Sequence, residues 1–496
     1  MAADLSSARP TGVADAGAEP RATSYSLRTL VIAAGIIWAV LFVVVGLRYQ
    51  LQLFADGAMF SYSVAVQEAW TFHWHNISGR LFVYLIAEAP AEFYVALTDD
   101  PRGGIVLYGL LFFATQLVGL LATWAGDRSP GRIIFSFACA STACLCPLVF
   151  GFPSEMWVAH ALFWPTLAVC HYARANTVGS VLIFSALLAL IFTHGGAVLL
   201  GVLILATLLL RGARDPAYVR AARFFLMAVL IWALVKLIFP PDAYDGPMMR
   251  RAALHFFDPA IFASHILVLL FAAAGSYAVA FLALDRLHPR KAHTYAGWLL
   301  ALALSAYWLW FDASLHGTER YPMRTVLLLG TLAFGLVAAA YALVCEGRLK
   351  VRPAVLQHGM AFFTRDAATR AILGAFLIVM LVHGVETAKF VRAWTGYEAA
   401  VRALAMSDAS DRALGDVHFV SASRIDPALN RLSWFSTTQF LSVLVAPRFA
   451  PERLVVDPTG NYFWLSCNTA AASQMADRAI PVESRRLIRV HACLHR

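Results

Sequence analysis

The sequence predicts an all-α polytopic membrane protein of about eleven transmembrane helices, with a small domain of mixed α/β structure at its C-terminus. Composition is the first observation: 60% of the 496 residues are hydrophobic and only 14% are charged, values that exclude an ordinary soluble domain. The second is that apolar runs long enough to cross a bilayer core of about 30 Å recur from Leu30 to Val391. The third is the change to mixed polar sequence after Lys389.

The chain divides into three predicted parts. Residues 1–27 lack an apolar run and have the composition of a disordered cytoplasmic leader. Residues 28–391 form the transmembrane domain, and residues 392–496 form the C-terminal extracytoplasmic domain. The expected spans are 28–48, 105–125, 133–150, 157–172, 178–193, 195–210, 221–239, 260–284, 295–311, 325–345 and 371–391. Much the longest loop between spans is 49–104.

Arginines predict which side of the membrane each loop faces. They precede the first span and cluster in alternate loops, as at Arg128 and Arg132 and again at Arg211 and Arg214. Because short cytoplasmic loops retain positive charge, the N-terminus is expected inside and the opposite loops outside. The preference for Arg over Lys in an Ala-rich chain is typical of GC-rich bacteria. We therefore expect the bacterial cytoplasmic (inner) membrane, with a periplasmic C-terminal domain.

Two cysteines, Cys467 and Cys493, fall in that predicted domain, whereas the other five lie in or at the ends of spans. An oxidising compartment allows an exported pair to form a disulfide. Chance occurrence of two thiols is the alternative explanation. The sequence contains no Cys-x-x-Cys metal pattern.

A carboxylate, Asp56, follows the first span closely, at the start of the loop 49–104. Farther along this loop, residues 58–70 have the apolar spacing of a helix lying in the interface plane. Residues 81–97 are apolar but are interrupted by two glutamates and a proline, so this segment is expected to dip back or to lie flat. A carboxylate at this depth beside a structured loop indicates chemistry.

Further polar side chains that share the outward side of the bundle lie near Asp56 or in short outward turns: His73, His75, Asn76, Arg80, Glu155, His160 and His194. Any one of them has an ordinary explanation, because aromatic and basic residues are common at the head-group level. Their density beside Asp56 is what favours a binding site.

A second constellation precedes the tenth span, where Arg320 and Arg324 are four residues apart. On a helix they would share one face, with His316 one turn earlier. Such a face suits a phosphate, because guanidinium groups pair bidentately with phosphate oxygens. The alternative is a structural network in which the two arginines pair with Asp312 and Glu319.

A third outward loop contains Arg250 together with Asp242 and Asp245. The Asp-x-x-Asp spacing leaves a divalent cation open, but in a Pro- and Gly-rich turn such residues more often cap the backbone. No metal site and no certain cofactor is assigned.

The location of charge separates classes of membrane protein. Transporters need ionisable residues or broken helices near the bilayer midplane, and the mid-span positions here look almost clean of charge. The polar residues gather at one interface instead. This favours an enzyme whose substrates lie partly in the outer leaflet.

With these features the chain resembles the polytopic glycosyltransferases of the GT-C fold class. The likeness covers the membrane region: an N-inside first span, a long first extracytoplasmic loop, an acid shortly after that span and a C-terminal extracytoplasmic domain. The family often has two neighbouring acids in that loop, whereas here Asp56 is followed by Gly57. The C-terminal domain matches no family pattern.

The resemblance implies an inverting transfer of a sugar from a polyprenyl-phosphate donor to an envelope glycan or lipid acceptor. It makes Asp56 the general base. The groups implied to stabilise the leaving phosphate are Arg320, Arg324, His316 and Arg250. The groups implied to line the acceptor side are His73, His75, Asn76, Arg80, Glu155, His160 and His194.

Two alternatives stay open at this point. A transporter or flippase of a lipid-linked envelope precursor would use the same polar rim to bind a head group, and Asp56→Asn would then only weaken binding. A non-catalytic assembly protein would use its C-terminal domain for docking. It would have no buried polar cavity joining the long loop to the Arg320 loop.

Overall fold

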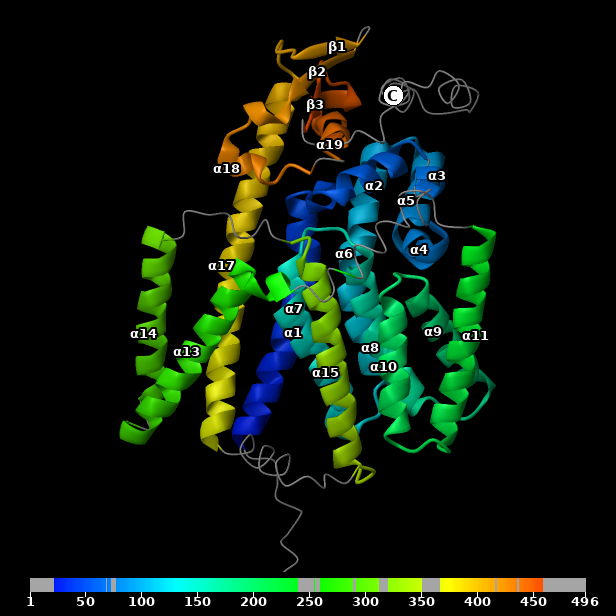
Figure 1. Ribbon diagram of the computed structural model, residues 1–496, viewed down its shortest axis with the longest axis vertical. Coiled ribbons are helices and arrows are strands. Elements are labelled where there is room, and N and C mark those ends of the chain that lie inside the picture. The colour runs from blue at the N-terminus through cyan, green and yellow to red at the C-terminus, as the bar shows by residue number, and fades with distance from the viewer. Residues whose placement is uncertain are drawn as a thin grey trace, which may run out of the picture.

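The computed structural model describes residues 22–67, 69–72, 77–239, 254, 259–288, 291–311, 320–349, 366–414, 417–434 and 437–457. These residues are mostly helical (Figure 1). The helices of the membrane region are α1 (Ala22–Arg48), α2 (Asp56–Ala65), α3 (Ala69–Phe72), α4 (Ile77–Val83), α5 (Ala89–Thr98), α6 (Pro101–Gly126), α7 (Ile133–Val149), α8 (Glu155–Tyr172), α9 (Thr177–Ile191), α10 (Ala197–Leu209), α11 (Pro216–Ile238), α13 (His265–Leu287), α14 (Ala292–Ala306), α15 (Met323–Cys345) and α17 (Asp366–Ala405). The C-terminal part adds β1 (Arg412–Leu414), β2 (Val417–Ser421), α18 (Pro427–Asn430), α19 (Thr438–Val445) and β3 (Leu454–Val456).

Eight helices among the described residues are long and apolar enough to cross a membrane, which supports a multi-pass membrane protein. The sequence predicts eleven spans, and two of these, α9 and α10, are apolar helices of only 15 and 13 residues. Conversely, the helical segment Arg80–Thr98 is long and apolar enough to cross a membrane, although the sequence analysis predicts it to lie inside the loop 49–104. The number of eleven and the sides of the membrane stay predictions.

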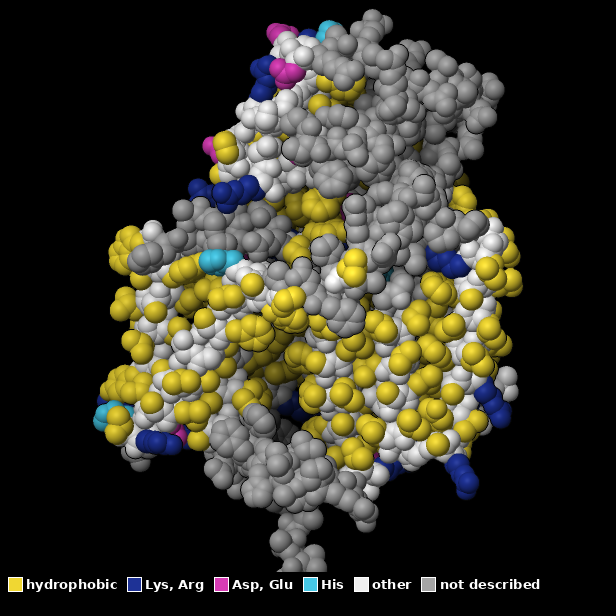
Figure 2. Space-filling model, in the orientation of Figure 1, with side chains coloured by type: hydrophobic (Ala, Val, Ile, Leu, Met, Phe, Trp, Pro, Cys, Tyr) yellow, Lys and Arg dark blue, Asp and Glu magenta, His cyan; other side chains and the backbone are white. Residues whose placement is uncertain are grey.

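Several arginine-rich loops meet at one end of the bundle. Arg28, in the first half of α1, donates to the carbonyl of Gly131, which lies just before α7. Arg220 on α11 donates to the carbonyl of Arg174 at 2.7 Å, and Arg348 after α15 lies 3.9 Å from Asp215. Basic side chains mark the lower end of the bundle in Figure 2, below a flank covered by hydrophobic residues. The loops that the sequence predicts to be cytoplasmic therefore share one end.

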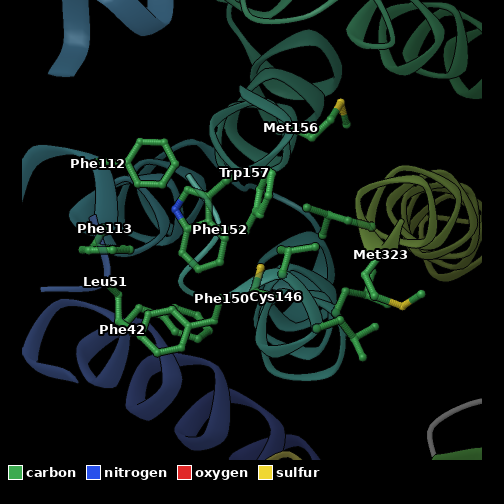
Figure 3. Packing of buried hydrophobic residues seen from close by; sticks show 14 of the residues in the cluster. Phe42, Leu51, Phe112, Phe113, Cys146, Phe150, Phe152, Met156, Trp157 and Met323 are labelled. Atoms are coloured by element: carbon green, nitrogen blue, oxygen red, sulfur yellow. The ribbon is translucent and has the colours of Figure 1, made fainter. Parts of the chain in front are cut away.

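An aromatic core lies where α1, α6, α7 and α8 pack together (Figure 3). Trp157 is its centre: the indole lies 4.8 Å from the ring of Phe42 and 6.3 Å from the ring of Phe112. Trp157 and Phe42 are almost completely buried. This core fixes the ends of α1 and α8, from which the candidate site is built.

Helix α2 differs from the predicted interfacial helix over residues 58–70. Eight of its ten residues are buried, because α5 and α6 pack against it from the membrane region and α19 packs against it from the C-terminal part. Helix α2 is therefore covered by protein on most sides, and its position in the interface plane stays a prediction. Figure 1 shows α2 between the bundle and the C-terminal elements.

The C-terminal part continues from the bundle without a break in the helix. Helix α17 has 40 residues and passes through the predicted domain boundary at 391/392. Beyond it, β1 pairs antiparallel with β2, and β2 pairs parallel with β3. Trp394 on α17 donates its indole N–H to the carbonyl of Tyr49 at 2.8 Å. The C-terminal elements are thus fixed to the end of α1.

Candidate functional site

Asp56 is the first residue of α2 and follows a short 3₁₀ turn at Leu51–Leu53. The preceding residue, Ala55, has φ 51° and ψ −127°, a region that L residues rarely occupy. Gly57 has no room for a side chain, because a Cβ would lie 2.2 Å from the carbonyl oxygen of Gln52. Strained backbone of this kind clusters at functional sites. A side chain, acidic or not, therefore cannot take the position of Gly57 unless the backbone shifts.

The carboxylate of Asp56 is held at the junction between the bundle and the C-terminal part. Trp434 donates its indole N–H to Asp56 Oδ1 at 3.1 Å. Burial raises the pKa of Asp56 from 3.8 to about 6, with Glu155 adding to the increase, while the Arg324 and Arg80 guanidinium groups and the Trp434 hydrogen bond oppose it. Asp56 therefore titrates close to neutral pH.

An ion pair lies beside Asp56. Arg80 on α4 contacts Glu155 Oε1, at the start of α8, at 2.8 Å. Burial raises the pKa of Glu155, but Arg80, His194 and Arg324 outweigh it and hold the pKa at about 2. Burial lowers the pKa of His194, in the turn between α9 and α10, to about 4. Near pH 7 Asp56 therefore has around it the carboxylate of Glu155, the guanidinium cations of Arg80 and Arg324, and the neutral imidazole of His194.

Arg324 is fixed by aromatic rings. Its guanidinium lies 3.8 Å from the ring centre of Tyr321 and 5.2 Å from that of Phe152, and its Nε donates to the carbonyl of Tyr321 at 3.2 Å. Tyr321 and Phe152 also contact the indole of Trp434, at 5.0 and 5.7 Å between ring centres. The rings that hold Arg324 therefore also hold the hydrogen-bond donor of Asp56.

A narrow pocket opens beside this group. Its space of about 290 Å³ includes a part that is open to solvent, and it admits roughly one water molecule. Its walls combine ionisable and aromatic side chains: Phe60, Arg80, Val83, Tyr84, Glu88, Tyr108, Phe112, Ser154 and Glu155. Tyr84 and Glu88 are the ends of a π-helical segment between α4 and α5, a distortion that often occurs at functional sites.

Arg320 does not share the position of Arg324. The sequence prediction that both lie on one helical face was wrong, because α15 begins at Met323 and Arg320 lies in the turn before it. Arg320 is only 3% exposed, donates to the carbonyl of Pro147 at 2.8 Å and lies over the ring of Phe390 at 3.8 Å. Phe390 in turn contacts Phe54, so an aromatic wall separates Arg320 from the Asp56 group.

His160 lies inside the bundle. It is completely buried and hydrogen-bonds with Ser141 Oγ at 2.8 Å and with Gln116 Oε1 at 3.0 Å. These partners join α8 to α7 and α6, so the geometry gives His160 a structural environment away from the pocket. His194, Glu155 and Arg80, by contrast, are brought together with Asp56.

The remaining predicted residues, namely His73, His75, Asn76, Arg250, His316, Cys467 and Cys493, lie outside the described residues. The same holds for Asp242 and Asp245. Within the described part of the chain, no group of three or more His, Cys, Asp or Glu side chains is placed to hold a metal ion.

Sequence reasoning did not find Trp434, Tyr108 or two buried ionisable residues of α17. His383 and Glu386 are 2% and 3% exposed inside the predicted span 371–391, where the sequence analysis expects almost no charge. A glutamate within an apolar run is a visible signal. The sequence around Trp434 contains no such signal, because its hydrogen-bond partner, Asp56, is 378 residues away in the chain.

Comparison with known proteins gives no match: no protein-family model, curated protein or solved structure matches the chain.

Proposed function

We propose that the chain is an inverting membrane glycosyltransferase, which moves a sugar from a polyprenyl-phosphate donor to an envelope glycan or lipid acceptor at the outer face of the membrane. One observation carries the proposal. Asp56, with a pKa of about 6, lies at the end of the bundle opposite the arginine-rich loops, within electrostatic reach of Arg324 and Arg80.

Asp56 acts as the general base. The acceptor hydroxyl oxygen attacks the anomeric carbon, its proton passes to the Asp56 carboxylate, and the bond from that carbon to the phosphate oxygen breaks. A base works best when its pKa lies near the operating pH, which is what burial achieves for Asp56. The polyprenyl phosphate leaves as an anion with an additional charge.

Arg324 stabilises that anion. Its guanidinium is held in place by Tyr321 and Phe152 before substrate arrives, and a preorganised cation contributes most where charge develops in the transition state. Its Nε–H donates to the backbone carbonyl of Tyr321, which occupies one N–H group. A guanidinium has five N–H donors, so others can pair with phosphate oxygens. Arg320 has no part in this step, because it faces Pro147 and Phe390.

The acceptor enters from the side of the narrow pocket. Arg80 and Glu155 are paired there at 2.8 Å, and Tyr108 and Ser154 line the same walls. Such a set of donors and acceptors suits sugar hydroxyl groups. The pocket is too narrow for a sugar in this state, so α4 and the π-helical segment must move outward for the acceptor to bind.

The test is transfer of labelled sugar from a polyprenyl-phosphate donor pool in membranes that contain wild-type protein or Asp56→Asn. We expect the substitution to lower transfer roughly 10²- to 10⁴-fold, the usual contribution of a general base. Asp99→Asn is the matched control, since Asp99 is an exposed acid in the same loop region, at the end of α5. It should transfer like wild type.

Other outcomes separate the alternatives. Transfer that persists in a correctly inserted Asp56→Asn variant removes Asp56 from the chemistry. Absence of transfer in wild type, together with Asp56-dependent binding of a lipid-linked precursor, favours the transporter. The assembly protein predicts neither transfer nor binding.

A further inference from the structure

The C-terminal part of the chain touches the candidate base itself. Trp434, between α18 and α19, reaches Asp56 Oδ1 at 3.1 Å across the junction. This contact is the direct link from the C-terminal elements to the carboxylate on which the proposed function depends.

Two aromatic rings contact the indole of Trp434 at the junction. Tyr321 contacts it at 5.0 Å and Phe152 at 5.7 Å between ring centres, at tilted and edge-on angles that aromatic pairs prefer. Both rings belong to the membrane region. The indole N–H therefore points to Asp56 in one fixed direction.

The surrounding C-terminal elements are anchored close to Asp56. Phe440 on α19 packs on Tyr62 of α2, with 5.0 Å between ring centres. Arg102 on α6 donates to the carbonyl of Ala446 at 3.4 Å and lies 4.8 Å from the ring centre of Phe449. Because α2 carries both Asp56 and Tyr62, the C-terminal part and the carboxylate form one packed unit.

We propose that Trp434 is a positioning residue of the transferase: its indole N–H holds Oδ1 of Asp56, so that Oδ2 is directed to the acceptor hydroxyl. This inference rests on the proposed function and assigns to the C-terminal part a role in the reaction. Oδ2 can accept the proton efficiently only if the plane of the carboxylate has a fixed orientation. A hydrogen bond from the rigid indole to Oδ1 fixes that orientation.

The charged and titratable groups that face Asp56 from the packed elements are Arg324 on α15, Glu155 on α8 and Arg80 on α4, with the phenol of Tyr108 on α6. Trp434 differs from all of them because it is neutral and directly hydrogen-bonded. A hydrogen bond to the charged form lowers the pKa of a carboxyl group. Its loss must therefore raise the pKa of Asp56 further.

The test compares Trp434→Phe with Trp394→Phe. Each substitution keeps a ring and deletes one indole N–H at the junction, but the N–H of Trp394 donates to the carbonyl of Tyr49 and not to a carboxylate. For Trp434→Phe we expect the acidic limb of the transfer-versus-pH profile to move to higher pH by about one unit, since hydrogen bonds to charged groups have this strength. For Trp394→Phe we expect no movement of the limb.

A second measurement keeps the inference separate from the proposed function. The thermal stabilities of each protein and of the same protein with Asp56→Asn are compared across pH, which follows the titration of Asp56 without any substrate. We expect the transition in this difference to move to higher pH in Trp434→Phe only. If wild type transfers no sugar, the proposed function fails, and this measurement still decides the Trp434 contact.

The inference is overturned if neither profile moves in Trp434→Phe, or if both tryptophan variants move them equally. A loss of transfer at every pH with no movement of either profile would also overturn it, since that pattern indicates lost packing and not a lost hydrogen bond to Asp56.

Discussion

Two carboxylates in this molecule, the half-buried Asp56 and the buried Glu386, are built from the same parts and differ in what surrounds them. Asp56 accepts the indole N–H of Trp434 at 3.1 Å, and Glu386 on α17 accepts the indole N–H of Trp308 at 3.0 Å. Each also interacts with an arginine that leads into or begins α15, Arg324 for Asp56 and Arg320 for Glu386.

The Glu386 group is closed. Glu386 is 3% exposed, Lys389 lies 3.4 Å from its Oε1, and Arg320 is fixed between Phe390 and the carbonyl of Pro147. That carbonyl lies in the last turn of α7, where helix carbonyls lack partners and a cation is favourable. The group thus joins α17 and the turn before α15 to the last turn of α7.

The Asp56 group lies beside a pocket and at a junction between two parts of the chain. Its arginines serve several neighbours, since Arg324 acts on Asp56, Glu155 and His194 together. An acid with an indole and an arginine is therefore not by itself a site. The neighbouring pocket and the junction with the C-terminal part distinguish the Asp56 group.

Removal of each arginine tests most directly whether the Glu386 group is structural and the Asp56 group functional. Arg320→Ala should lower the free energy of unfolding by about 3–5 kcal/mol, because it leaves Glu386 buried with less compensation. Arg324→Ala should change stability little but lower sugar transfer about 10²-fold, as loss of a preorganised group for a developing anion does. Unfolding in detergent and transfer in membranes measure the two effects.

Each arginine variant is the other's control. Equal losses of stability in both variants would make the two groups alike and would contradict the distinction between a structural and a functional acid.

The next largest effect concerns pH. Because the pKa of Asp56 is raised to about 6 in the folded protein, its contribution to stability is fully present below about pH 4 and is lost as pH rises through about 6. Relative to Asp56→Asn, wild type should lose on the order of 3 kcal/mol across this range. The measurement is the melting temperature of wild type and of Asp56→Asn as a function of pH. A difference between the two that stays constant between about pH 4 and about pH 8 would contradict the raised pKa of Asp56.

The smallest effect tests the backbone of the site. Gly57→Ala would place a Cβ 2.2 Å from the carbonyl oxygen of Gln52, and forced shifts of this kind cost about 1–3 kcal/mol. Gly275→Ala in α13 is the matched control, since nothing lies within 4 Å of its Cβ and alanine favours a helix. A Gly57→Ala protein as stable as the control would contradict the close approach.

The sequence predicted the parts of the site that depend on local pattern. It placed Asp56 just after the first span and singled out Arg80, Glu155, His194 and Arg324, which lie together. It could not separate Arg320 from Arg324, because a spacing of four residues implies one face only if the helix has already begun, and α15 starts at Met323.

Other features depend on contacts between distant segments. The burial of α2 requires α19, which follows it by more than 370 residues, so an apolar helix that looks interfacial alone becomes a core element. Trp434 is likewise defined only by its partner. Glu386, by contrast, is a glutamate within an apolar run, so its burial could be predicted from the sequence alone.

The unbroken course of α17 sets the angle at which the C-terminal elements meet the bundle. An α-helix turns by about 100° per residue, so one residue gained or lost in α17 between Glu386 and Trp394 would rotate everything beyond it by that amount. Trp434 would then point away from Asp56 although every local contact in the C-terminal part was kept. The length of α17 between Glu386 and Trp394, more than its composition, therefore determines where Trp434 lies relative to Asp56.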